Sequence, residues 1–165
     1  MKTTFIKAVF YILSVSFMLL THKVNAQTQD TPGKMTGWKD AKFGMFMHWG
    51  LYSKTADYWD GRKAKEDFML YERIPWKENA KIADDFNPVN YDAEKWVLVA
   101  KEAGMKYIII TTKHHDGFAM YNSPSSDYNI VNRTLYGKDP IKTLVESCRK
   151  HDMKFCFYYS LWRDL

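Results

Sequence analysis

The sequence predicts an α/β fold in which parallel strands alternate with helices. Three short apolar runs, each with the length of a strand, are separated by two segments whose apolar residues recur at helical spacing. Because a strand, a helix and a further strand in series form a right-handed βαβ unit, these strands are expected to lie parallel in one sheet. No internal repeat and no linker divides the series, so we expect one continuous domain.

The first strand is expected within the apolar run 43–50 (FGMFMHWG). The length of this run and its flanking glycines indicate a buried strand that ends near His48. Residues 51–80 follow as a long, irregular and aromatic-rich connection. Short helical pieces are expected near 66–71 and 76–86.

Two helices and two further strands complete the series. The spacing of apolar residues predicts a helix over 92–103, and Gly104 stands where a C-terminal cap belongs. The run 107–110, a tyrosine followed by three β-branched isoleucines, predicts a strand that is covered on both faces. A second apolar stripe over 141–148 predicts the next helix, and the run 154–160 (KFCFYYS) predicts the third strand.

A barrel is favoured over a doubly wound sheet. The glycine-rich turn of a dinucleotide-binding fold is missing after every expected strand. A complete (β/α)8 TIM-like barrel needs about 250 residues. We therefore expect the chain to hold only about the first three βα units of such a barrel, as a fragment.

The N-terminus is typical of a secretory signal of 26 residues. Basic Lys2 and Lys7 precede an apolar run over 8–20, and a small-residue exit over 24–26 (VNA) precedes a cleavage point after Ala26. The apolar run is shorter than the roughly 20 residues that span a bilayer, and no later stretch comes closer, so no membrane association is expected after cleavage. A retained membrane anchor is the alternative. These features predict a secreted or periplasmic protein whose barrel part covers 27–165.

Charge and cysteine content bound the remaining function classes. The net charge of the chain is +5, and removal of the predicted signal takes away three lysines and no acid, which leaves +2. No basic stripe remains in the folded part, so no nucleic-acid partner is expected. Cys148 and Cys156 are read as two thiols or as a single disulfide bond, and the sequence leaves both possibilities open.

Histidine and tyrosine side chains follow the expected strands at their carboxyl ends. His48 follows the first strand, the cluster 114–116 (His-His-Asp) follows the second, and Tyr158 and Tyr159 end the third. In parallel α/β barrels this edge of the sheet holds the active site. We therefore expect these side chains to share one site.

A metal site is the competing interpretation of the histidine cluster. His114, His115 and Asp116 are ordinary zinc ligands, as a metal-dependent hydrolase would use. Adjacent strand residues point in opposite directions, however, and no HExxH pattern is present. A neutral imidazole also suits a sugar hydroxyl, because one ring nitrogen donates a hydrogen bond while the other accepts one. We expect no metal ion and no cofactor.

Several segments in the same order resemble the α-L-fucosidases of glycoside hydrolase family 29. The KHHDGF motif with an upstream HWG is the most specific feature, and the resemblance extends over nearly all of residues 36–165. The matching segments are 42–53, 58–59, 86–88, 91–96, 103–123, 127–129 and 154–160.

This resemblance implies a fucose pocket built from donors, acceptors and apolar surface. The residues that it assigns to the sugar are His48, His114, His115, Tyr158, Trp59 as an apolar wall, and Glu66 on the hydroxyls. Glu66 lies in a variable loop and is read equally as a solvated glutamate. Strand alternation allows only one residue of the Tyr158–Tyr159 pair to face the pocket, and the sequence does not fix which.

The resemblance also implies hydrolysis of terminal α-L-fucosyl residues from oligosaccharides or glycoconjugates by retaining double displacement. An Asp nucleophile and a Glu acid/base are then required. In similar enzymes the nucleophile lies at the end of a later barrel strand, so the resemblance implies that both carboxylates lie beyond Leu165. Asp116 lies in a turn before Gly117 and is read as structural. We expect no activity from the 165-residue chain alone. A non-catalytic fucose-binding protein or degenerate glycosidase is the alternative.

Overall fold

The computed structural model describes residues 35–64 and 68–161. Its contacts divide the chain into two compact units, Met1–Gly37 and Trp38–Leu165. The second unit contains the sheet and the candidate site, and the short helix α2 (Thr36–Ala41) lies at the boundary. The predicted signal segment and Glu66 lie outside the described residues.

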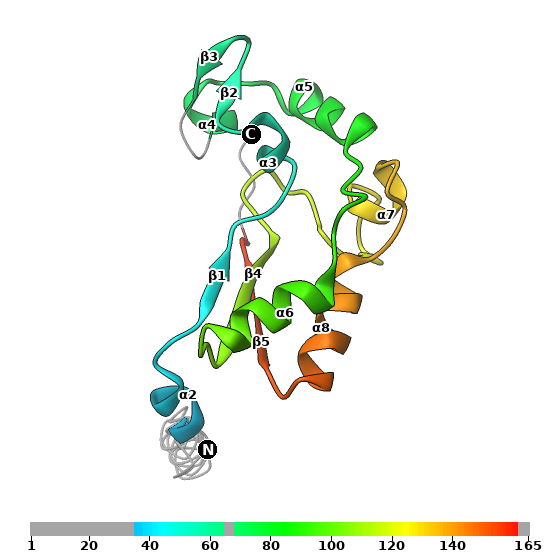
Figure 1. Cartoon of the computed structure of the whole chain (residues 1–165). Helices are drawn as coiled ribbons and strands as arrows, with labels where there is room; N and C mark the ends of the chain where they lie inside the picture. Colours follow the sequence, from blue (N-terminus) through cyan, green and yellow to red (C-terminus); the bar gives the residue numbers. More distant parts are fainter. Residues whose placement is uncertain (1–34, 65–67, 162–165) are drawn as a thin grey trace, which may run out of the picture. The chain divides into compact units, whose positions relative to one another are not determined.

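A parallel sheet of three strands forms the centre of the second unit, as predicted. Its strands are β1 (Met45–Met47), β4 (Tyr107–Lys113) and β5 (Lys154–Tyr159), in the order β1-β4-β5 (Figure 1). Both strand pairs are parallel. The central strand β4 carries the continuous β-branched run, and Ile108 and Ile110 on it are fully buried.

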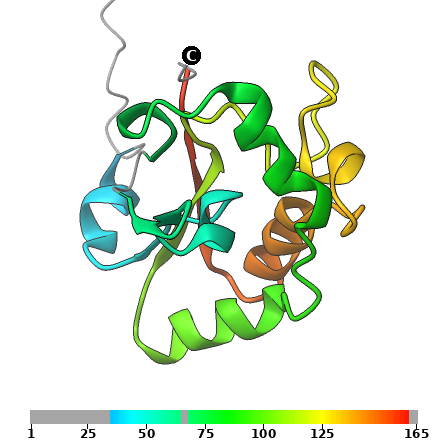
Figure 2. The same cartoon turned by 90° about the horizontal axis from the view of Figure 1, so that it is seen from above.

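Helices α6 (Ala93–Glu102) and α8 (Pro140–Lys150) pack side by side on one face of this sheet (Figures 1 and 2). Each begins at an aspartate whose side chain accepts a backbone N–H in the first turn. Asp92 accepts from Lys95, and Asp139 accepts from Lys142. These bonds satisfy N–H groups that a helix start leaves without partners, so the helices begin where the sequence predicts.

The connection between β1 and α6 is more ordered than the sequence indicates. It contains a hairpin of two short antiparallel strands, whose turn residues Asp60 and Gly61 both have positive φ. An Asp-Gly pair is the preferred turn of a two-residue hairpin. The elements of this connection are α3 (Tyr52–Thr55), β2 (Tyr58–Trp59), β3 (Arg62–Lys63), α4 (Phe68–Tyr71), α5 (Trp76–Ala80) and the 3₁₀ helix η1 (Lys81–Asp85).

Helix α7 (Ile130–Arg133) is a further element that the sequence did not predict. The side chain of Asn129 accepts the backbone N–H groups of Val131 and Asn132 and so caps it. Asn129 is itself fully buried. This single turn therefore depends on its cap and its burial rather than on helical periodicity.

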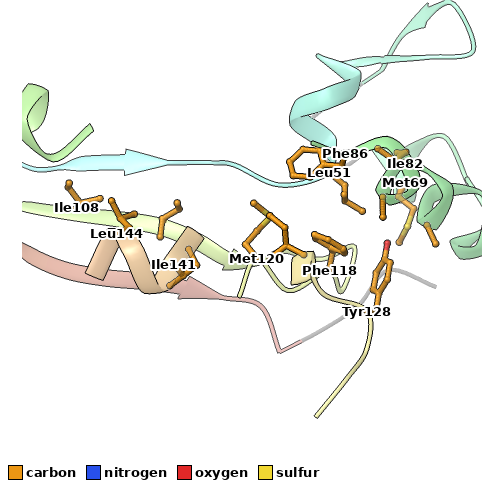
Figure 3. Close-up of a cluster of buried hydrophobic side chains, with 14 of the residues drawn as sticks. Leu51, Met69, Ile82, Phe86, Ile108, Phe118, Met120, Tyr128, Ile141 and Leu144 are labelled. Atoms are coloured by element: carbon orange, nitrogen blue, oxygen red, sulfur yellow. The ribbon is translucent and has the colours of Figure 1, made fainter. Parts of the chain in front are cut away.

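The hydrophobic core extends from the sheet into the loops beyond the strand ends. Figure 3 shows Ile108, Ile141 and Leu144 at the helix-covered face. The cluster continues through Met120 and Phe118 to residues of the long connection, which are Leu51, Met69, Ile82 and Phe86. Burial of this apolar surface holds the connection against the sheet.

Cys148 and Cys156 are both free thiols. Of the two possibilities that the sequence left open, two thiols or one disulfide bond, the structure shows the first. Cys148 is buried in α8, and this burial raises the pKa of its thiol to about 11. Among the described residues, no helix is both long enough and apolar enough to cross a membrane.

Candidate active site at the carboxyl ends of the strands

Three ring-bearing residues from three strands lie at one edge of the sheet. His48 directly follows β1, and His114 directly follows β4. Tyr158 is the second-last residue of β5. The register places Thr111 of β4 beside Tyr158, and Met47 beside Ile110. Parallel pairing thus brings residues that are far apart in the sequence to the same edge.

The side-chain rings of these residues gather around His114. Its ring centroid lies 5.6 Å from that of His48, edge to face, and 5.6 Å from that of Tyr158, stacked at 25°. The centroids of His48 and Tyr158 are 6.2 Å apart. The structure therefore forms a strand-end cluster, which we define as His48, His114, His115 and Tyr158.

His115 joins the cluster, and in this respect one expectation from the sequence was wrong. The imidazoles of His114 and His115 were expected to point apart, but their centroids lie 4.6 Å from each other at an interplanar angle of 74°. The reason is that β4 ends at Lys113, and the chain then turns, with the N–H of Gly117 donating to the carbonyl of His114. Strand alternation does not apply within such a turn.

Strand alternation does separate the two tyrosines of β5. Tyr158 faces the histidines, while Tyr159 lies on the other face beneath the ammonium group of Lys113, 5.1 Å from its ring centroid. Tyr159 lines an apolar groove with Phe155 and Phe157. The structure thus places Tyr158, and not Tyr159, in the strand-end cluster.

Buried hydroxyl groups tie the strand ends together. The side-chain oxygen of Thr111, which is 1% exposed, accepts the N–H of Trp49 at 2.9 Å and donates to its carbonyl at 3.1 Å. The hydroxyl of Tyr52 lies 2.8 Å from the same oxygen, and its ring lies 5.2 Å from that of His114. These contacts fix the chain next to His48 against β4.

Trp49 anchors the same strand end on the helix-covered side. Its ring stacks on Tyr91 with centroids 4.9 Å apart and meets Trp96 edge to face at 5.1 Å. The hydroxyl of Tyr91 donates to the carbonyl of Pro140 at 2.8 Å, and burial raises the pKa of this tyrosine. The aromatic cluster holds β1 against both helices, so that His48 projects from a fixed base.

Sequence reasoning missed Tyr52, Thr111 and Ser160 as parts of the site. Ser160 lies at the end of β5, and its hydroxyl oxygen is 2.7 Å from Nδ1 of His115. Each of these residues lies within or beside a segment that resembles the family, but a hydroxyl group at a strand end gives no distinct signal. Its partner is set by tertiary structure.

Trp59 and Asp116, which the sequence also singled out, are not members of the strand-end cluster. Trp59 is in β2, half-buried and packed against the hydrophobic core. Asp116 is buried, and its Oδ1 accepts the N–H of Phe118 at 3.0 Å, in agreement with its predicted structural role. Among the described residues, no three His, Cys, Asp or Glu side chains are grouped so as to hold a metal ion.

Comparison with known proteins identifies the family of this chain. The family model described as alpha-L-fucosidase matches residues 18–164. The chain belongs to the α-L-fucosidase family. The resemblance inferred from the KHHDGF and HWG motifs is thereby confirmed.

Relatives of known sequence and structure share this membership. The α-L-fucosidase of Branchiostoma floridae is 33% identical and the human tissue α-L-fucosidase 32% identical, over 78% and 77% of this chain. These alignments cover 31% and 29% of the relatives. The chain therefore spans about a third of the length of the curated α-L-fucosidases that it matches.

Solved α-L-fucosidases show the same local fold. The enzyme from Lactobacillus casei in complex with its α-L-fucose product is 44% identical, with a TM-score of 0.72 over 74% of this chain and 39% of that one. The enzyme from Bacteroides thetaiotaomicron, trapped as a covalent intermediate with 2-fluoro-fucosyl fluoride, is 36% identical. Its TM-score is 0.75, and the match covers 78% of this chain and 30% of that one.

Proposed function

We propose that the protein is a retaining α-L-fucosidase that removes terminal α-L-fucosyl residues from glycans. The observation that carries this proposal is the strand-end cluster. Side chains from three parallel strands meet at the carboxyl edge of the sheet, in a chain that belongs to the α-L-fucosidase family. In barrels of this kind, that edge holds the chemistry.

The cluster has the hydrogen-bonding capacity that fucose requires. Each neutral imidazole offers one donor and one acceptor, and the hydroxyl of Tyr158 offers both, so the four side chains can pair with several sugar hydroxyls. Trp59 would supply apolar surface for the methyl group and Glu66 a carboxylate for a hydroxyl. We assign these six residues to substrate binding.

The chemical step would be a double displacement. A carboxylate oxygen of an Asp attacks the anomeric carbon while a Glu protonates the departing oxygen, and water then attacks the glycosyl-enzyme with retention of configuration. The covalent intermediate that was trapped in the Bacteroides thetaiotaomicron enzyme supports this route. We place both carboxylates outside the 165 residues, because the chain spans only about a third of the length of the curated α-L-fucosidases that it matches. Asp116 is given a structural role, since its Oδ1 accepts the N–H of Phe118.

The three-stranded sheet would be part of a (β/α)8 barrel. Within the described residues, β1 and β5 each pair on one side only, and Phe46 on the site-facing surface is 50% exposed. Further strands beside β1 and β5 would satisfy their free edges and would enclose the strand-end cluster.

The substrate would be a fucosylated oligosaccharide or glycoconjugate. The Lactobacillus casei enzyme has been solved with Fucα(1,6)GlcNAc and with 4-nitrophenyl α-L-fucopyranoside. We also propose that residues 1–26 direct the protein to a secreted or periplasmic location, where such glycans are accessible.

The test is hydrolysis of 4-nitrophenyl α-L-fucopyranoside by the complete gene product, with the 165-residue chain assayed beside it. We expect the complete product to release nitrophenol and the shorter chain to release none. Proton NMR should show the α-anomer of fucose as the first product. Fucose binding without turnover would indicate a non-catalytic protein. The absence of both binding and turnover would contradict the proposal.

A further inference from the structure

We infer that Ser160 is a positioning residue that holds the imidazole of His115 in one orientation. Its hydroxyl engages Nδ1 and leaves Nε2 for Tyr158 and the sugar. This inference deepens the proposed function at the same site, because it rests on the assignment of His115 to fucose binding.

The contact between Ser160 and His115 is short and partly buried. The hydroxyl oxygen lies 2.7 Å from Nδ1, which is within the range of a good hydrogen bond, and Ser160 is only 5% exposed. The serine side of this bond is therefore largely shielded from water. The hydroxyl can serve either tautomer of the ring, since it can donate or accept.

The backbone of Ser160 is itself fixed on both sides by one residue of β4. Its N–H donates to the carbonyl of Lys113 at 2.9 Å, and its carbonyl accepts from the ammonium group of Lys113 at 2.7 Å. Lys113 lies two residues before His115. The end of β4 thus positions Ser160, and Ser160 in turn positions the histidine that follows β4.

The other ring nitrogen of His115 faces the cluster. Nε2 lies 3.5 Å from the hydroxyl of Tyr158, which is longer than a strong hydrogen bond. Contacts of this kind in a ligand-free site often tighten when the ligand binds. With Nδ1 engaged by Ser160, Nε2 is the nitrogen that a sugar hydroxyl would meet.

A neighbouring threonine offers a matched control. Thr112 is also 5% exposed, and its hydroxyl also joins β4 to β5, but it donates to the backbone carbonyl of Tyr158 at 3.0 Å. Removing that hydroxyl weakens the sheet without removing a bond to an imidazole. A comparison of Ser160 with Thr112 therefore separates positioning from general stability.

The test measures L-fucose binding by the complete gene product with isothermal titration calorimetry. We expect Ser160→Ala and Ser160→Cys to raise Kd about tenfold, since each loses a good hydrogen bond to the ring. Thr112→Val should change Kd less than about twofold. Ser160→Thr, which keeps the hydroxyl, should bind within about threefold of the unmodified protein.

A second measurement does not depend on fucose. In the complete gene product with ¹⁵N-labelled histidine, the Nδ1 resonance of His115 is identified by its loss in His115→Gln. This resonance should shift in Ser160→Ala, which removes the hydrogen bond to Nδ1, and should stay in place in Thr112→Val. An unshifted resonance in Ser160→Ala would overturn the inference. So would unchanged Kd values for Ser160→Ala and Ser160→Cys, or an equal rise in Thr112→Val. If the resonance shifts as expected but the unmodified protein binds no L-fucose, the proposed function fails instead.

Discussion

His114 is the residue on which the strand-end cluster is centred. Its ring contacts those of His48, His115, Tyr52 and Tyr158. A ring in this position is oriented by its neighbours before any ligand arrives. Such preorganisation reduces the entropy that binding would otherwise cost.

Replacement of His114 should therefore impair fucoside hydrolysis. His114→Gln in the complete gene product is expected to lower kcat/KM for 4-nitrophenyl α-L-fucopyranoside about 100-fold, because the hydrogen bonds that we propose it makes to the sugar and its ring contacts are lost together. His151→Gln is the control, since His151 lies after α8 and contacts Glu94 instead. Equal activity of the two variants would refute the role given to His114.

Thr111 should matter for stability as well as for the site. Thr111→Val leaves the N–H and carbonyl of Trp49 and the hydroxyl of Tyr52 without this partner, at a cost of about 1–3 kcal/mol in the free energy of unfolding. Urea denaturation measures the change. Thr143→Val, on the exposed side of α8, should cost about 0.5 kcal/mol or less, and a similar loss in both variants would contradict the prediction.

For single residues, the sequence predicted that the histidines lie together at the strand ends, but it did not predict the residues that support them. His48 and His114 were recognisable because each directly follows an apolar strand. Ser160 pairs with a residue 45 positions away and Thr111 with one 62 positions away, so their roles depend on the register of the sheet. The same register decides between Tyr158 and Tyr159.

Among the elements, the two long helices follow directly from the local sequence. Their apolar spacing predicted both, and the aspartates at their starts, Asp92 and Asp139, each accept a backbone N–H of the first turn. The Asp60-Gly61 hairpin was also encoded locally but was overlooked because its strands are only two residues long. The irregularity in pairing between Thr111 and Lys113 has no local signal, since it arises from the fit of β4 against β5.

The cap of α8 should contribute more to stability than the cap of α6. The side chain of Asp139 accepts the N–H of Lys142 and also that of Asn122. Among the described residues, the side chain of Asp92 accepts the backbone N–H of Lys95 alone. We expect Asp139→Ala to lower the free energy of unfolding by about 2 kcal/mol and Asp92→Ala by about 1 kcal/mol. Thermal or urea denaturation measures both losses. A larger loss in Asp92→Ala than in Asp139→Ala would contradict this prediction.

An ion-pair network between α6 and α8 should make stability depend on pH. The carboxylate of Glu94 lies 2.6 Å from the ammonium group of Lys150 and 3.0 Å from the ring of His151. These hydrogen bonds, that of Lys150 first, lower the pKa of Glu94. Because the pKa of Glu94 is lowered in the folded state, its carboxylate stabilises the fold at a pH above the unfolded pKa of about 4.3. This stabilisation is lost as the pH falls through the pKa of the folded state.

Glu94→Gln is accordingly expected to lower the urea midpoint slightly at pH 7 and to have no effect at a pH below the folded pKa. The comparison is made by denaturation of both proteins between pH 7 and pH 3. Because the pair is exposed, added salt should reduce the difference at pH 7. A difference that grew as the pH fell would show that the carboxylate plays another part.

At the scale of the whole molecule, the order of strands and helices was predictable because each βαβ unit has a single preferred hand and direction of pairing. The parallel sheet and its site-bearing edge follow from that rule. The long connection between β1 and α6 was not predictable in detail, since its short elements are held by the core residues Leu51, Met69 and Phe86 rather than by their own periodicity.

The most direct measurement is a crystal structure of the complete gene product with L-fucose bound. We predict that hydroxyl groups of the sugar lie within hydrogen-bonding distance of His48, His114, His115 and Tyr158 at the carboxyl edge of the sheet. Fucose bound at another place, with these four side chains making no contact with it, would contradict the proposed site.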